Sequence, residues 1–183
     1  MATNPTKNTV EFLTQRLERE ERYLDECIAR ITKYNTETIP AKAKAKKPKI
    51  LEPIDIDTNT EVLGLRKAIK SYNYAISCVN GDIISVPEDS EALIQYMEKH
   101  VKNMQIHLDC AKNRLEKAKA KREKNMKQNP KKYSKRKPIP DVNSEIINDS
   151  IILGHYETAV SSMKENDRRS NGITIDLNER RIR

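Results

Sequence analysis

The sequence is poor in the residues that form tight turns and enclosed pockets. Its 183 residues include four Gly, one Phe and no Trp. Only 36% of them are hydrophobic, whereas soluble domains usually have about 45–50%. These shortages argue against a compact enzyme fold, and they predict a thin core built from long helices that polar segments join.

Long apolar runs and signal-like segments are also missing. No run approaches the roughly 18 residues that would cross a bilayer. Residues 1–7 lack the apolar centre of a secretory signal. We therefore expect no membrane span and no secretion. An intracellular setting, in the cytoplasm or nucleus, or a place in a virion fits this composition.

Cysteine is scarce and irregularly spaced. The three thiols, Cys27, Cys78 and Cys110, form no CxxC pair, so neither a disulfide framework nor a zinc ribbon is indicated. His107 and Cys110 have the i, i+3 spacing of two ligands on one helix, but a structural zinc site needs about four. We expect no metal and no cofactor, and thiols that act as small apolar side chains.

Catalytic motifs are not found either. The glycines stand alone rather than in a phosphate-binding loop. No Ser lies in a nucleophile elbow, and no HExxH pair is present. The sequence therefore predicts a protein that is not an enzyme.

What the sequence does have is a long helical period within residues 88–128. Apolar or small residues recur there at alternating spacings of four and three, which places one stripe along an α-helix. The stripe comprises Met97, Val101, Met104, Leu108, Ala111, Leu115 and Ala118. A helix of this length is a rod on the order of 60 Å long, and such a rod needs partners along it.

Three further helices are predicted, within residues 1–35, from residue 60 to about residue 80, and over residues 144–167. The second of these and the long helix would form a hairpin over residues 60–129. The second stripe ends at Asn80-Gly81, and Gly suits a helix C-terminus. The same dipeptide could close a β-hairpin instead, but five successive apolar intervals match the helical period, so we prefer the helix.

The segments between the helices are predicted to be extended. Residues 36–59 form a Pro/Lys-rich linker, residues 130–143 a basic arm, and residues 168–183 a tail with a short strand. The fold prediction is all-α: an elongated helical bundle or coiled coil of about four helices, with one long central helix, basic extended linkers and a C-terminal β-type tail. Because the seam spacing suits pairing within one chain and between chains equally, a homo-oligomer stays open.

Positive charge is concentrated in two segments. Residues 112–137 contain thirteen Lys or Arg and two Glu, a net charge of +11, and residues 42–49 contribute +5. Because the whole chain carries +8, the rest carries −8. This concentration indicates an anionic partner. The residues expected to contact it are Lys42, Lys44, Lys46, Lys47, Lys49, Lys119, Lys121, Arg122, Lys131, Lys132, Lys135, Arg136 and Lys137.

Short alternating apolar strips are the expected protein interfaces. Alternation suits an extended segment that lies on a partner surface. The alternatives are ordinary loop packing for the first strip and a frayed or locally packed terminus for the second. The strips are Ile54 and Ile56 in the linker, and Ile173, Ile175 and Leu177 in the tail.

Two function classes follow. The first is a non-enzymatic structural or assembly protein of a large complex, such as a virion or ribonucleoprotein-like particle, whose basic arms dock on neighbouring subunits or nucleic acid. The second is a protein that binds or packages RNA or DNA without sequence specificity. Tyr133 is the only aromatic residue in the basic arm, which argues against readout by base stacking.

Overall fold

A computed structural model describes residues 5–44, 50–82, 85–128 and 142–180, with the backbone alone described at residues 5, 142 and 171–180. Every regular element in these residues is helical, so the predicted all-α class is confirmed. The elements are α1 (Pro5–Lys33), the π-helix η1 (Tyr34–Thr38), α2 (Ile39–Ala43), α3 (Thr60–Asn80), α4 (Ser90–Gln128) and α6 (Val142–Arg180).

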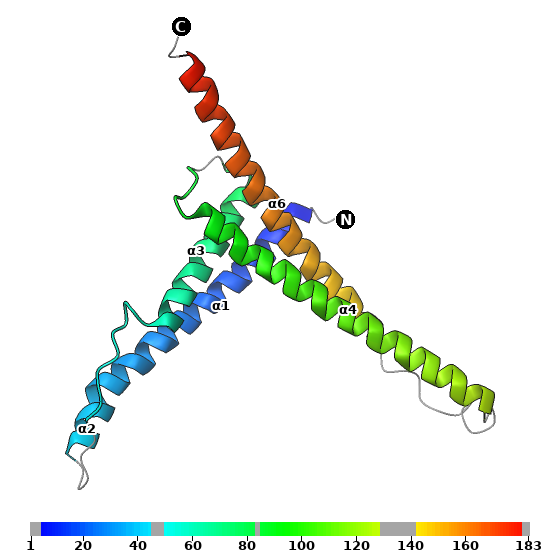
Figure 1. The fold of residues 1–183 in the computed structure, drawn as a ribbon, viewed down its shortest axis with the longest axis horizontal. Coiled ribbons are helices and arrows are strands. Elements are labelled where there is room, and N and C mark those ends of the chain that lie inside the picture. The colour runs from blue at the N-terminus through cyan, green and yellow to red at the C-terminus, as the bar shows by residue number, and fades with distance from the viewer. Residues whose placement is uncertain (1–4, 45–49, 83–84, 129–141, 181–183) are drawn as a thin grey trace.

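The helices form a three-armed molecule (Figure 1). One arm holds α1 with α3 antiparallel to it, and a second holds α4 with α6 antiparallel to it. The C-terminal part of α6 runs on alone as the third arm. The four long helices meet at one junction, where α6 crosses from the second arm to the third and packs on α3 and α1.

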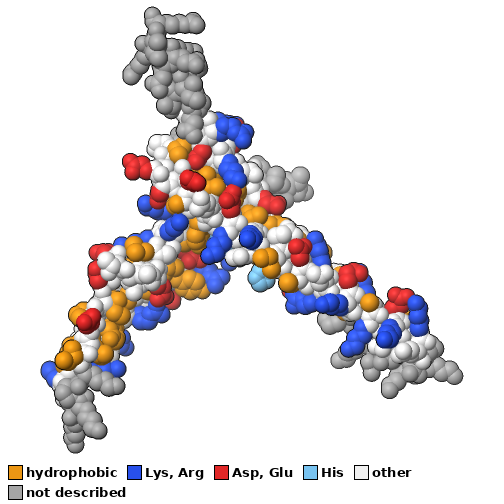
Figure 2. Space-filling model, viewed as in Figure 1, with side chains coloured by type: hydrophobic (Ala, Val, Ile, Leu, Met, Phe, Trp, Pro, Cys, Tyr) orange, Lys and Arg blue, Asp and Glu red, His pale blue; other side chains and the backbone are white. Residues whose placement is uncertain are grey.

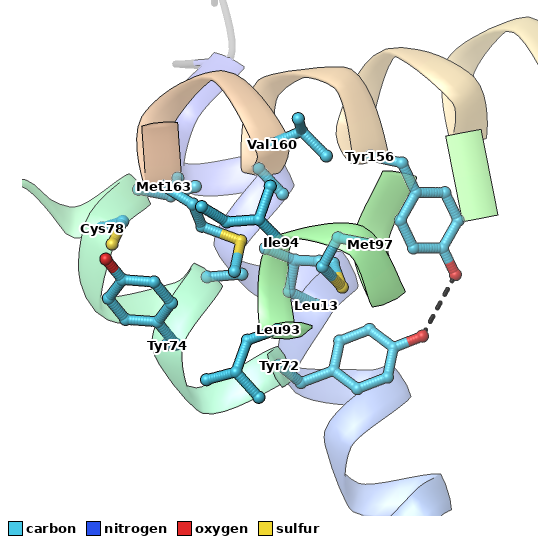
Figure 3. Packing of buried hydrophobic residues seen from close by; sticks show 13 residues of the cluster. Leu13, Tyr72, Tyr74, Cys78, Leu93, Ile94, Met97, Tyr156, Val160 and Met163 are labelled. Carbon is cyan, nitrogen blue, oxygen red and sulfur yellow. Dashed lines mark hydrogen bonds between the residues drawn. The ribbon is translucent and has the colours of Figure 1, made fainter. Parts of the chain in front are cut away.

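The main core lies at this junction (Figure 3). Helices α3, α4 and α6 each contribute several buried residues, and α1 contributes Leu13 together with the partly buried Val10 and Leu17. The buried members are Leu13, Tyr72, Tyr74, Ala75, Cys78, Val79, Leu93, Ile94, Met97, Tyr156, Ala159, Val160 and Met163. A smaller cluster of Cys27, Ile31 and Val62 holds the arm of α1 and α3 together. Away from the junction the first and second arms are at most two helices thick, and the third is α6 alone.

Local signals set the ends of α3. The Asn59 side chain accepts hydrogen bonds from the backbone N–H groups of Glu61 and Val62, at 3.0 and 3.2 Å, and so caps the first turn. At the other end Gly81 has φ +81°, and its N–H donates to the Cys78 carbonyl. A side chain there would be strained. The prediction of a helix rather than a hairpin before Gly81 is therefore confirmed.

The expected strand in the tail is wrong. Instead, α6 continues through Gly172 to Arg180, so the backbone of residues 173–177 is helical. A lone strand leaves its backbone groups unpaired, whereas a continued helix pairs them within the segment. The linker also begins later than expected, because η1 and α2 extend the first helix to Ala43. Pro40 is tolerated since it lies in the first turn of α2.

The pairing of the helices differs from the hairpin expected over residues 60–129. In the structure α3 lies mainly along α1, and α4 lies mainly along α6. Leu108 and Ala111 of the long stripe are buried, as expected for seam residues. The helix that lies along theirs is α6, however, and not α3 as the predicted hairpin would require. Seam spacing specifies that a helix has a partner without specifying which one.

Candidate nucleic-acid interface

The described parts of the two basic segments, residues 42–44 and 112–128, lie towards the ends of different arms (Figures 1 and 2). Lys42 and Lys44 are exposed in and after α2, at the end of the first arm. Lys119, Lys121 and Arg122 are exposed in the distal part of α4, at the end of the second. The structure therefore does not bring the two groups together. The other predicted basic residues, Lys46, Lys47, Lys49, Lys131, Lys132, Lys135, Arg136 and Lys137, lie outside the described residues.

The distal part of α4 is exposed because α6 accompanies only its proximal part. An ion pair of 2.6 Å between Arg114 and Glu145 joins α4 to the beginning of α6. From Lys119 to Gln128 every side chain is exposed except that of Asn125. Residues 112–128 contain eight Lys or Arg, two Glu and no aromatic residue. Such a surface can contact phosphates but cannot stack on bases.

The cations of this segment fall into two groups. Three of them have carboxylate partners: Arg114 pairs with Glu145, Lys119 with Glu116 at 3.2 Å, and Lys127 with Glu123 at 2.8 Å. Among the described residues the other five have no ion-pair partner. They are Lys112, Lys117, Lys121, Arg122 and Lys124.

Sequence reasoning chose only part of this second group. It included Lys121 and Arg122 but missed Lys112, Lys117 and Lys124. It also counted Lys119, whose charge Glu116 offsets. The signal was present in the sequence, because Glu116 and Glu123 precede Lys119 and Lys127 by three and four positions, the spacing at which helical side chains meet.

The apolar strip of the linker is partly used within the chain. The Asn35 side chain donates to the Ile54 carbonyl at 2.8 Å and accepts from the Ile54 N–H at 2.9 Å, which ties the strip to η1. Ile56 is half-buried against the cluster of Cys27, Ile31 and Val62. The Ile54 side chain stays 37% exposed. The side chains of Ile173, Ile175 and Leu177 lie outside the description.

Three isoleucines on the second arm were not predicted as interface residues. Ile106 of α4 is 52% exposed, and Ile147 and Ile151 of α6 are 60% and 55% exposed. Ile147 and Ile151 are one helical turn apart, so they lie on the same side of α6. The sequence alone did not single them out, because a two-helix arm buries only one side of each helix and the sequence does not show which side that is.

Aromatic and imidazole rings fill the junction between the arms. His100 of α4 stacks on Tyr156 of α6, with ring centres 5.0 Å apart, and lies near Tyr96 and Tyr72. The hydroxyls of Tyr72 and Tyr156 share a buried hydrogen bond of 3.3 Å (Figure 3). His155 stacks on Phe12 of α1 at 4.9 Å.

Both imidazoles are held in their neutral form. Burial lowers the pKa of His100, and the nearby charges of Arg16 and Lys99 lower it further. Burial alone lowers the pKa of His155, whose Nδ1 is 2.9 Å from the Thr9 hydroxyl. Burial also raises the pKa of Tyr96 to about 12. The junction is therefore a neutral, closely packed contact at neutral pH.

A polar groove beside the junction is the place where catalytic chemistry could be sought among the described side chains. It lies between the end of α3 and α6, and Cys78, Asp82, Asn166 and Arg169 help to line it. Burial raises the pKa of the Cys78 thiol to about 11, so this sulfur is a poor nucleophile at neutral pH. The neighbouring Tyr74 hydroxyl donates to Asp167. These partners give the groove hydrogen bonding, but no activated group.

Within the described ranges, His, Cys, Asp and Glu side chains form no group of three that could hold a metal ion. Across the same ranges, no helix is long and apolar enough to span a membrane. These findings leave the basic end of α4 and the exposed isoleucines as the candidate functional surfaces. No protein-family model, curated protein or solved structure matches this chain.

Proposed function

We propose that this chain is a non-enzymatic assembly protein of a large complex, such as a virion or an intracellular ribonucleoprotein-like particle. The observation that carries the proposal is the placement of contact groups on thin arms that project from one core. A molecule built for a buried active site would gain nothing from such arms. Arms two helices thick can reach neighbouring subunits while the junction holds them together.

The second arm has the surfaces that docking would need. Ile106, Ile147 and Ile151 are more than half exposed, and a partner that covered them would gain about 25 cal/mol for each Å² of apolar surface buried. Farther along the same arm the exposed cations begin. We infer that the proximal part contacts protein and the distal part contacts an anion.

A second candidate function is binding of nucleic acid without sequence specificity as the main role. The five cations of residues 112–128 that lack partners among the described residues favour it. In that case single chains would bind along the nucleic acid, and the three exposed isoleucines would contribute nothing to the function.

Light scattering on nuclease-treated protein separates the two candidates. The assembly function predicts a mass above one chain for the wild type, reduced by the variant Ile147→Ser/Ile151→Ser. The control variant is Leu63→Ser, which removes an apolar side chain 47% exposed on the first arm and should leave the mass unchanged. If the wild type has the mass of one chain and still binds DNA, the second candidate replaces the first.

A further inference from the structure

The charges of the distal part of α4 are sorted around the helix axis. At about 100° per residue, Lys117, Lys121 and Lys124 fall within an arc of about 60°, and we name these three residues the lysine face. They lie on the side of α4 away from the buried Leu108 and Ala111, and hence away from α6. Both carboxylates of the segment lie on another side of the helix.

The opposite grouping is the paired flank, which we define as Lys112, Lys119 and Lys127. It lies roughly 130° around the helix from the lysine face. Glu116 and Glu123 share its arc, and they pair with two of its three lysines. Three Lys and two Glu give the paired flank a net charge of +1, whereas the lysine face has +3. The same helix thus presents a strongly basic side and a nearly balanced side.

The composition of the lysine face favours a phosphate polymer over an acidic protein. Protein interfaces are built around aromatic or apolar anchors and are depleted in Lys at their centre. The only apolar residues between Lys117 and Lys124 in the sequence are Ala118 and Ala120, and neither falls within the arc of the lysine face. None of residues 112–128 is aromatic. Phosphate contacts need only positive charge that can reach the backbone, and they release counterions.

We propose that the lysine face binds the sugar–phosphate backbone of nucleic acid independently of sequence, and that the paired flank does not. This inference deepens the proposed function, since it rests on the ends of the arms being docking elements. It names the partner at the end of the second arm and the three side chains that hold it. To reach a phosphate, a lysine of the paired flank would have to break its ion pair with a glutamate or pass close to a glutamate's negative charge.

The test compares two triple variants of the full chain in binding to a fluorescein-labelled DNA duplex of arbitrary sequence. The first, Lys117→Gln/Lys121→Gln/Lys124→Gln, removes the lysine face. The second, Lys112→Gln/Lys119→Gln/Lys127→Gln, removes the same number of charges from the same helix by the same substitution. Fluorescence anisotropy gives the binding constant over a range of salt, and circular dichroism checks that both variants keep their helicity.

Each phosphate contact contributes about 0.9 to the slope of log binding constant against log salt. Loss of the lysine face should therefore reduce the magnitude of that slope by about 2–3. Over a fourfold increase in salt concentration, the affinity of this variant should then fall by about 40-fold less than that of the wild type. Loss of the paired flank should reduce the magnitude of the slope by less than about 1. The proposal is overturned if both variants change the slope equally, if the wild type does not bind the duplex at low salt, or if labelled polyglutamate binds more tightly than the duplex.

Together with the mass of the wild type, these outcomes distinguish a failure of the lysine face from a failure of the proposed function. Equal slopes with an oligomeric wild type would remove the lysine face and leave the assembly function. A monomeric wild type with the predicted contrast in slopes would remove the assembly function and leave the lysine face.

Discussion

The hydroxyls of Tyr72 and Tyr156 depend on each other as hydrogen-bond partners in the core, so removal of either one should lower the free energy of unfolding. The side chains are 1% and 3% exposed, and their hydroxyl oxygens are 3.3 Å apart. Tyr72→Phe leaves the Tyr156 hydroxyl without this partner in the core, which costs about 1–3 kcal/mol. Tyr156→Phe should cost a similar amount. The double variant removes both polar groups together, so it should be more stable than the sum of the single losses predicts, by about 1 kcal/mol.

Urea unfolding followed by far-UV circular dichroism measures these free energies. Tyr23→Phe is the control, because the Tyr23 side chain is 37% exposed and its hydroxyl bonds to Arg19 at the surface. It should change the free energy of unfolding by less than about 0.5 kcal/mol. The reasoning is refuted if Tyr72→Phe is as stable as the wild type, or if the two single losses simply add in the double variant.

The remaining predictions concern pH and the seam of the second arm. Because the folded-state pKa values of His100 and His155 lie below the unfolded value of about 6.5, stability should be full above pH 6.5 and fall as the pH drops below it. In urea titrations the variant His100→Phe/His155→Phe should lose this dependence, and the exposed His107→Phe should keep it. Leu108→Asp places a charge at a 4% exposed seam position and should destabilise the fold by on the order of 3–5 kcal/mol. Thermal melts of Leu63→Asp, at a position 47% exposed on the first arm, should resemble the wild type.

The helices could be predicted from the sequence because burial of one face imposes the period of 3.6. The Gly81 boundary was predictable for a different reason, since a left-handed residue there excludes most side chains. Which helices pair could not be predicted, because the stripe that holds Leu108 accepts any apolar partner. The prediction for the tail was wrong because Ile173 and Ile175 alternate with polar residues as they would in a strand. A strand needs a second segment for its hydrogen bonds, whereas a helix forms them within itself.

The candidate site was predictable as a region but not as a set of side chains. Charge concentration along residues 112–128 located the region. The pairing of Lys119 with Glu116 could have been predicted from their spacing. Placing Lys117 on the side of α4 away from its partner helix requires the position of α6. The exposure of Ile147 likewise depends on α4 covering only one side of α6.

The mass of the protein in solution tests the assembly function most directly. One chain has a mass of 21.1 kDa. Light scattering on nuclease-treated wild-type protein should give a multiple of this mass, and the multiple should persist in salt that releases DNA, because the contacts at Ile147 and Ile151 are apolar. A mass of one chain at every concentration and salt would contradict the account.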